Sequence, residues 1–277
     1  MTDRQRFADH RVLVTGGGSG IGLGCATAFA AEGATVTICG RTESRLAEAA
    51  AAVGPSCQYV VADIGDEDAV RRAVEFAAGD DGVLHAVVAN AGGTGAVGPL
   101  PLVDAAAFEQ DLQLNVVGTF LTIKHAAPVI ARAGGGAIVA ISSIAGCLTH
   151  RNMAPYSAAK AGLEMLVRNA ADELGPWGVR VNAVRPGLVP SDASAPLAAH
   201  EPTRDDYLAQ MPLRRLGTTD DIAEAVLFFA GPDATWITGQ CLSVDGGHSL
   251  RRGPDLTELI GVHYTAALNT VMGGDPA

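Results

Sequence analysis

The chain has few basic residues, few cysteines and no long apolar run. Nineteen Lys and Arg face thirty Asp and Glu, and the net charge of -11 would repel nucleic acid and anionic membranes, so neither is expected as a partner. The ten residues MTDRQRFADH are polar, and no apolar stretch reaches eighteen residues, which favours a cytoplasmic protein. Five scattered cysteines form no CxxC pair and meet no histidine cluster, so we expect reduced thiols and no metal site.

The apolar residues, 48% of the chain, are arranged as strands and helices in alternation. Each run that predicts a strand is almost continuously apolar, as in a parallel sheet covered by helices on both faces. These runs are 11–15, 34–39, 57–62, 83–89, 136–142, 178–184 and 239–244. Helical periodicity, often preceded by Thr, Ser or Asp as a cap, marks 42–53, 66–78, 105–133, 156–174 and 219–230. The predicted fold class is α/β, a doubly wound, Rossmann-like parallel sheet of about seven strands.

Nothing in the composition divides residues 1–247, so we expect one domain there. Residues 190–215 contain four prolines and lack a clear pattern, which predicts a loop that could serve as a lid. Residues 248–277 form an extension in which apolar residues recur at helical spacing from Leu256 to Val271. We expect a short helix there, packed on the same or a neighbouring subunit.

The first predicted strand runs directly into a glycine-rich turn, TGGGSGIG, from which a helix begins. Glycines at 16, 20 and 22 permit a tight turn, a close backbone approach to a pyrophosphate, and close packing of helix on strand. The amides at the helix N-terminus favour an anion. A flexible turn without a ligand is the alternative. The dinucleotide hypothesis assigns cofactor contacts to Gly16, Gly18, Ser19, Gly20, Ile21 and Gly22.

Six motifs in order resemble those of the short-chain dehydrogenase/reductase family, in its single-domain form. The turn resembles the family's TGxxxGxG. Further along stand NAG at Asn90, Ala91 and Gly92, LNVVGTF around Asn115, Ser143 after the fifth strand, YxxxK at Tyr156 and Lys160, and Pro186-Gly187 after the sixth strand. The resemblance covers about residues 10–247 and implies an NAD(P)(H)-dependent oxidoreductase.

The end of the second strand bears on the choice between NADP and NAD. An acidic residue there would hydrogen bond the adenosine ribose and exclude a 2′-phosphate, but the chain has Arg41 followed by Thr42. Because a guanidinium can pair with a phosphate, we prefer NADP, with NAD as the alternative. Arg41 could instead stack on adenine or be solvated. By resemblance, Asp63 and Ile64 border the adenine, while an ordinary loop Asp is the competing interpretation.

Tyr156 and Lys160 lie four residues apart in a predicted helix and therefore share one face. A nearby positive charge would favour the phenolate and make proton exchange feasible near neutral pH. Ser143 would follow a strand at the carboxyl edge of the sheet, where its hydroxyl could hold a substrate oxygen, and Ser142 is its competitor. Asn115, in a long apolar helix, needs a partner if buried. It could be a satisfied packing amide.

The resemblance implies a mechanism for these residues. Hydride would pass between C4 of the nicotinamide and a substrate carbon, Tyr156 would exchange the proton, and Ser143 would orient the carbonyl. Lys160 would lower the pKa of Tyr156 and hold the nicotinamide ribose, and Asn115 would kink its helix and hold a water leading to Lys160. The residues expected to border the nicotinamide are Pro186, Gly187, Leu188, Val189 and Ser191.

Apolar residues in the expected substrate loops predict a ketone or secondary alcohol with an apolar portion, such as a 3-oxoacyl chain, a terpenoid or a steroid. His150 could meet a polar substrate group or be a solvated rim residue. Two other function classes stay open, a dinucleotide-binding sensor or scaffold without turnover, and epimerisation or dehydration on the same fold. By resemblance we expect a homotetramer built through the helices with Asn115 and Tyr156, with a second interface through 219–230 and 239–244.

Overall fold

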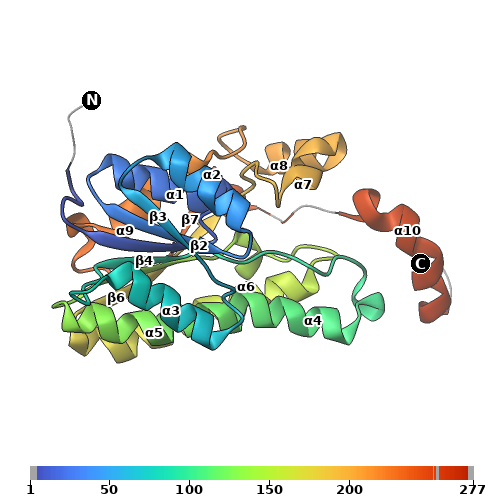
Figure 1. The fold of residues 1–277 in the computed structure, drawn as a ribbon. Helices are drawn as coiled ribbons and strands as arrows, with labels where there is room; N and C mark the ends of the chain where they lie inside the picture. The colour runs from blue at the N-terminus through green and yellow to red at the C-terminus, as the bar shows by residue number, and fades with distance from the viewer. Residues whose placement is uncertain (1–4, 252, 254–255, 274–277) are drawn as a thin grey trace.

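Seven parallel strands form one sheet at the centre of the protein (Figure 1). The computed structural model describes residues 5–251, 253 and 256–273. In spatial order the strands are β3 (Cys57–Val61), β2 (Thr35–Gly40), β1 (Arg11–Thr15), β4 (Ala86–Ala89), β5 (Gly136–Ile141), β6 (Val179–Pro186) and β7 (Cys241–Val244). The order reverses between β1 and β4, where ligands bind in open parallel sheets. The predicted doubly wound α/β fold is confirmed.

Helices cover both faces of the sheet. One layer holds α1 (Gly20–Ala31), α2 (Glu43–Val53) and α9 (Thr219–Ala230), and the other holds α3 (Glu67–Ala78), α5 (Gly118–Arg132) and α6 (Ala154–Leu174). Alternate strand residues enter opposite cores. Leu13 packs with α3, α5 and α6, whereas Val12 and Val14 pack with α1 and α9. Strands buried on both faces explain why their sequences are continuously apolar.

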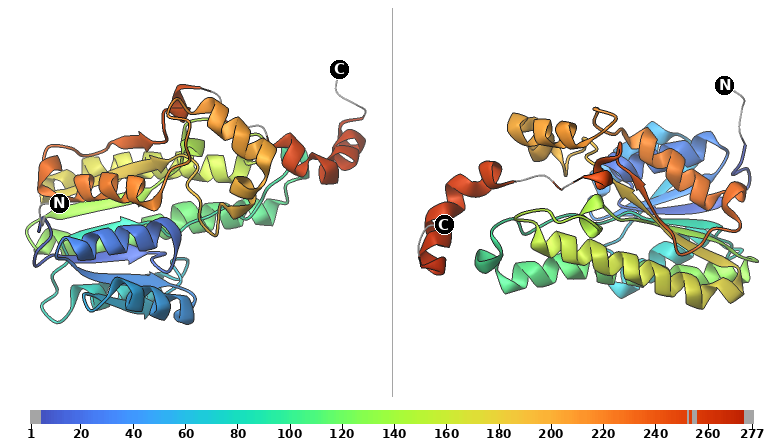
Figure 2. Two further views of the ribbon diagram at one scale, coloured as in Figure 1. Left: turned by 90° about the horizontal axis from the view of Figure 1, so that it is seen from above. Right: turned by 180° about the vertical axis from the view of Figure 1, so that it is seen from behind.

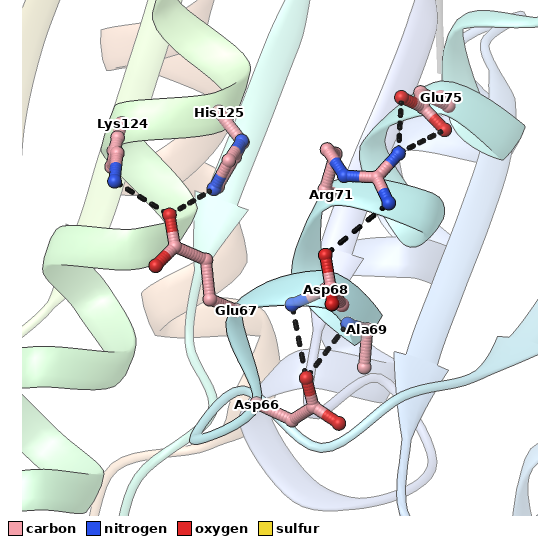
Figure 3. A network of polar contacts seen from close by, with 8 residues as sticks. All are labelled: Asp66, Glu67, Asp68, Ala69, Arg71, Glu75, Lys124 and His125. Carbon is pink, nitrogen blue, oxygen red and sulfur yellow. Dashed lines mark hydrogen bonds and ion pairs between the residues drawn. The ribbon is translucent and has the colours of Figure 1, made fainter.

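Helix α3 is fixed at its N-terminus by two sets of polar contacts (Figure 3). The Asp66 carboxylate accepts hydrogen bonds from the amides of Asp68 and Ala69, which caps the helix. The Glu67 carboxylate accepts from the side chains of Lys124 and His125 on α5, and these hydrogen bonds lower the pKa of Glu67. The predicted capping role therefore holds at α3, and the second contact ties two neighbouring helices together.

The predicted helix 105–133 is interrupted around Asn115, the residue at which the resemblance implies a kink. It consists of α4 (Ala105–Leu112), a π-helical segment (Gln113–Val117) and α5. By length and composition the run Ala105–Arg132 could cross a membrane, but 56% of its most apolar window is buried within the protein. We therefore interpret this run as a helix of the core.

Residues 190–215, expected to form an irregular loop, contain two helices. Helix α7 spans Ala195–Ala199 and α8 spans Glu201–Gln210. Their prolines lie in the first turn, where proline removes no helical hydrogen bond, and His200 caps α8 by accepting from the amide of Thr203. The prolines thus mark helix starts rather than a structureless segment.

The chain beyond β7 continues as a 3-10 turn (His248–Leu250) and helix α10 (Thr257–Met272). Figures 1 and 2 show α10 outside the two helix layers, and it contacts α8 and the 3-10 turn Leu100–Leu102. The ring of Tyr264 lies over Gly98 at about 3.5 Å from the place of a Cβ. Residues 1–4 of the predicted domain, and 252, 254–255 and 274–277 of the predicted extension, lie outside the described residues.

Candidate active site

A cavity of about 480 Å³ opens at the carboxyl ends of the strands, around the point where their order reverses. Most of the residues predicted for the site line it. They are Gly16, Ser19, Gly20, Ile21, Arg41, Asp63, Ile64, Asn90, Ala91, Gly92, Ser143, Tyr156, Lys160, Pro186, Gly187, Leu188, Val189 and Ser191. Gly18, Gly22, Thr42 and Asn115 are not among the lining residues. The fold thus gathers residues from seven stretches of the chain in one cavity.

The glycine-rich turn places the N-terminus of α1 at the cavity. Gly16 and Gly20 have φ of +65° and +53°, which favour glycine. A Cβ on Gly22 would lie only 2.3 Å from the Gly16 carbonyl oxygen. Ser19 begins the helix without a side-chain capping bond, and the first turn has no acidic residue. The exposed amides are therefore free of competing side chains, which suits a pyrophosphate group.

Two residues predicted as cofactor contacts, Gly18 and Thr42, lie next to α2 and outside the cavity lining, and their contacts with a cofactor stay predictions. A Cβ on Gly18 would be 3.6 Å from side-chain atoms of Arg45 and Leu46, so this glycine faces α2. Thr42 precedes α2 in extended conformation and makes no side-chain capping bond. The motif showed that the turn exists but not which way each of its residues points.

Arg41 and Asp63 line the cavity at the end where the sequence predicts the adenosine of a cofactor. Within the described part of the chain, no carboxylate forms an ion pair with Arg41, whereas nearby Arg45 pairs with Asp192 at 3.1 Å. The Asp63 carboxylate accepts a hydrogen bond from the amide of Gly65 and so shapes its own loop. Arg41 is the cation available to a ligand at this end.

The loop after β4 is held against the glycine-rich turn and leaves space beside Lys160. The side-chain amide of Asn90 donates from Nδ2 to the carbonyl oxygens of Thr15 and Gly16 at 2.9 and 3.1 Å. A Cβ on Gly92 would lie 2.7 Å from Asn115 Oδ1 and 3.3 Å from Lys160 Nζ. Glycine at 92 is therefore what allows these two polar side chains to approach one another.

Tyr156 and Lys160 lie one turn apart in α6, and both line the cavity. Lys160 is 3% exposed, its Nζ donates to the Ile141 carbonyl oxygen at 2.9 Å, and burial lowers its pKa to about 8. Burial raises the pKa of Tyr156, hydrogen bonding with Ser143 lowers it, and the charge of Asp111 raises it further. Desolvation is the largest of these effects, and the expectation that the charge of Lys160 favours the phenolate stays a prediction.

The two serines after β5 have different surroundings. Ser142 Oγ donates to Glu164 Oε1 at 2.8 Å, within a buried pair of Glu164 and Arg185. Ser143 begins a 3-10 turn, where its Oγ accepts from the Ala145 amide, and it interacts with Tyr156. Ser142 also borders the cavity, but its hydroxyl is committed to Glu164, which leaves Ser143 as the serine available beside Tyr156.

Asn115 lies in the π-helical segment, fully buried beneath the loop after β4. Its Nδ2 donates to the carbonyl oxygens of Gly93 and Asp111 at 2.7 and 2.9 Å, and its Oδ1 accepts from the Gly93 amide at 3.1 Å. A π-segment inserts one residue into a helix, often at a functional site. The water-holding role implied for Asn115 stays a prediction.

Sequence reasoning missed Asp111, which lies one turn before Asn115 and is 2% exposed. Its Oδ1 accepts from the Gly95 amide at 2.7 Å, so Asp111 and Asn115 together hold residues 93–95. Its charge also acts on Tyr156. The i, i+4 spacing of two polar residues in an apolar helix was the available signal.

The remaining lining residues form the nicotinamide and substrate sides of the cavity. Gly187 packs closely against Asp245, since a Cβ on Gly187 would be 2.9 Å from Asp245 Cα. This packing sets the path of the chain after β6. The backbone amide of Ser191 donates a hydrogen bond to Ser194 Oγ at 2.9 Å. His150 is 6% exposed, so its interpretation as a solvated rim residue is wrong. Apart from Thr94 and Tyr207, the other residues on the substrate side are mostly apolar, and they include Gly93, Ile144, Ala145, Met153, Leu188 and Leu197.

Comparisons with known proteins agree with this geometry. Residues 16–249 match the family model described as enoyl-(acyl carrier protein) reductase. The chain is 39% identical over 249 residues to cis-4-hydroxycyclohexanecarboxylate dehydrogenase of Sinomonas cyclohexanicum, covering 88% of this chain and 98% of the relative. A short-chain type dehydrogenase/reductase from Mycobacterium ulcerans has a TM-score of 0.91 at 42% identity, covering 93% of this chain and 96% of that one.

A third similar protein was solved with ligands, a 7α-hydroxysteroid dehydrogenase complexed with NADH and 7-oxo glycochenodeoxycholic acid. Its TM-score is 0.83 at 34% identity, covering 89% of this chain and 97% of that one. A sequence match to the Escherichia coli enzyme of that name has the same identity. The similar proteins thus include enzymes named for oxidation or reduction at a ring carbon.

The packing of the glycine-rich turn gives a prediction about two of its glycines. Gly22→Ala should weaken dinucleotide binding at least about tenfold, because the new methyl group must displace the Gly16 carbonyl. Gly18→Ala should change it little, because its Cβ would make only ordinary contacts. Fluorescence titration of both variants with NADPH and NADH measures this. Equal losses in the two variants would contradict it.

Proposed function

Because the chain belongs to the short-chain dehydrogenase/reductase family, we propose that it interconverts a secondary alcohol and a ketone in an apolar, ring-containing molecule. Membership makes it an NAD(P)-dependent oxidoreductase acting on alcohols and ketones. The observation that carries the proposal is that Ser143, Tyr156 and Lys160 line the same cavity as the glycine-rich turn. The apolar substrate side and the two ring substrates named for similar proteins support the choice of substrate class.

The residues fit a nicotinamide dinucleotide along the length of the cavity. The amides at the start of α1 would hold the pyrophosphate, Asp63 and Ile64 would border the adenine, and Pro186 to Ser191 would border the nicotinamide. The bound cofactor supplies or accepts the hydride. Tyr156, kept neutral by burial, would donate a proton to the carbonyl oxygen in reduction and take it back in oxidation.

Ser143 and Lys160 would support Tyr156 in different ways. The Ser143 hydroxyl would orient the substrate oxygen toward the phenol. Lys160, with a pKa of about 8, would be charged at neutral pH and could hold the ribose hydroxyls while stabilising negative charge on Tyr156 in the transition state. Asn115 and Asp111 would position the loop 93–95 that borders the substrate.

NADP is the cofactor that we propose, with NAD as the alternative. The support is Arg41, which has no ion-pair partner within the described residues and borders the adenosine end of the cavity. A 2′-phosphate would give it a bidentate partner.

We also propose that residues 1–247 form one catalytic domain, with 248–277 as its extension, in a cytoplasmic homotetramer. Exposed apolar side chains lie on the surfaces predicted to form interfaces. Phe120 on α5 and Met165 on α6 are 44% and 52% exposed, and Leu242 on β7 is 43% exposed. These surfaces would be covered by neighbouring subunits.

Replacing Tyr156 tests the proposed chemistry directly. Tyr156→Phe should lower kcat about 10²- to 10⁴-fold by removing the proton donor, while NADPH binding changes by less than about threefold. Tyr59→Phe on β3, outside the cavity, is the control for loss of a phenol. Unchanged turnover in Tyr156→Phe would leave a dinucleotide-binding protein without this chemistry.

Arg41→Ala tests the cofactor preference. The variant should bind NADPH at least about tenfold more weakly with little change for NADH, because only NADPH carries the phosphate that the guanidinium would meet. Arg71→Ala, on the outer face of α3, controls for the loss of one positive charge. Equal weakening for both cofactors, or tighter binding of NADH by the wild type, would overturn the preference.

A further inference from the structure

Two polar side chains on the substrate side of the cavity have no part in the proton transfer assigned to Tyr156. His150 lies before α6 and Tyr207 on α8, and both line the cavity. They are 6% and 4% exposed, so each is withdrawn from bulk water. Polar groups held in such a position cost free energy unless a ligand or a neighbour satisfies them.

The hydrogen-bonding capacity of His150 follows from its Nδ1 contact. Nδ1 lies 3.1 Å from the Leu148 carbonyl oxygen, which can only accept, so the proton of the neutral ring belongs on Nδ1. Burial, and then the charge of His248, lower the pKa of His150, while the Leu148 contact opposes them in part. Nε2 is therefore a bare acceptor, and no hydrogen-bond donor for it is found among the residues that the structure describes.

Tyr207 supplies the opposite capacity. Its ring packs edge-on against that of His248, with centroids 5.3 Å apart, which fixes the side chain from the C-terminal segment. Burial raises the pKa of Tyr207, as does the charge of Tyr156, so the phenol stays protonated and can donate. Tyr207 borders the cavity, and among the described residues no hydrogen bond to its hydroxyl is found.

Residues at and beyond the end of the family match lie against the wall that carries these groups. His248 is fully buried, and Leu256, beyond the matched residues 16–249, is fully buried as well. Gly253 passes so close to the segment before His150 that a Cβ would lie 2.1 Å from the Thr149 carbonyl oxygen. The C-terminal extension therefore pre-organises this end of the cavity.

Lys160 is the one lysine or arginine among the described residues that line the substrate end. Arg41 lies at the adenosine end, and Asp192 is engaged by Arg45. A carboxylate at His150 and Tyr207 would lose its hydration and face the Nε2 lone pair without a compensating charge. An uncharged oxygen meets no such penalty.

We propose that His150 and Tyr207 bind a second, uncharged oxygen of the substrate, and that they bind a hydroxyl oxygen better than any other uncharged oxygen. Such a hydroxyl would donate to His150 Nε2 and accept from the Tyr207 phenol, so both uncommitted groups would be satisfied at once. A second ketone oxygen could accept from Tyr207 alone. The substrate class is accordingly a ring hydroxyketone and its diol rather than an oxocarboxylate. The inference rests on the proposed function.

The test compares ketones that differ only in the second group. The substrates are cyclohexanone, the 2-, 3- and 4-hydroxycyclohexanones, and 4-oxocyclohexanecarboxylate, each with saturating reduced cofactor. Wild-type enzyme should give the best hydroxyketone at least about tenfold higher kcat/KM than cyclohexanone, and the oxocarboxylate a lower value than cyclohexanone. Tyr207→Phe should reduce the ratio of hydroxyketone to cyclohexanone by about tenfold, since the lost hydrogen bond concerns only the second oxygen.

Two further variants make the result specific. His150→Phe should reduce the same ratio, and Tyr59→Phe should leave it unchanged. A ratio unaltered by Tyr207→Phe, or an oxocarboxylate that is the best substrate, would overturn the inference while the proposed function stands. Failure of wild-type enzyme to reduce any of these ketones while it binds the cofactor would contradict the proposed substrate class, and the inference would fall with it.

Discussion

The burial of Lys160 is the constraint on which the rest of the site depends. An ammonium group withdrawn from water is costly, and here one carbonyl oxygen, that of Ile141, and the charge of Glu164 offset only part of the cost. The lowered pKa of Lys160 reflects the part of this cost that is not offset. The fold accepts this cost to keep a cation one helical turn from Tyr156, at the edge of the sheet where ligands bind.

Several features elsewhere follow from making room for that cation. Gly92 has no side chain where one would strike Asn115 and Lys160. Asn115 sits in a π-segment, which lets its amide reach both Gly93 and the backbone of Asp111. The loop after β4 is thereby held by Asn115 and Asp111 as well as by the bonds of Asn90 to the end of β1. Ser142 is held in a similar way, because its hydrogen bond to Glu164 leaves Ser143 as the hydroxyl beside Tyr156.

Much of the fold could be predicted because strands of a parallel sheet that is covered on both faces have almost continuously apolar sequences. Residues 12–14 and 137–141 are apolar without interruption, and the parallel arrangement of the strands brings Ser143, Gly16 and Asn90 to one edge. Side-chain directions could not be predicted in the same way. Gly18 lies against α2 and Thr42 precedes that helix, so neither lines the cavity, and no periodicity reveals an inserted residue at Asn115. The prolines before α7 and α8 indicated a loop because local sequence alone does not separate a helix start from a helix break.

The pH dependence of stability tests the buried cation most directly. Between the native pKa of about 8 and the ordinary lysine value of 10.5, this site binds more protons in the unfolded chain than in the native protein, so the contribution of Lys160 to stability rises with pH through this window. Groups shared with Lys160→Met cancel in the difference between the two free energies of unfolding. That difference should move in favour of wild type between pH 8 and pH 10, by at most about 1.4 kcal/mol per pH unit. A difference that stays constant over this range would contradict a buried Lys160 with a lowered pKa.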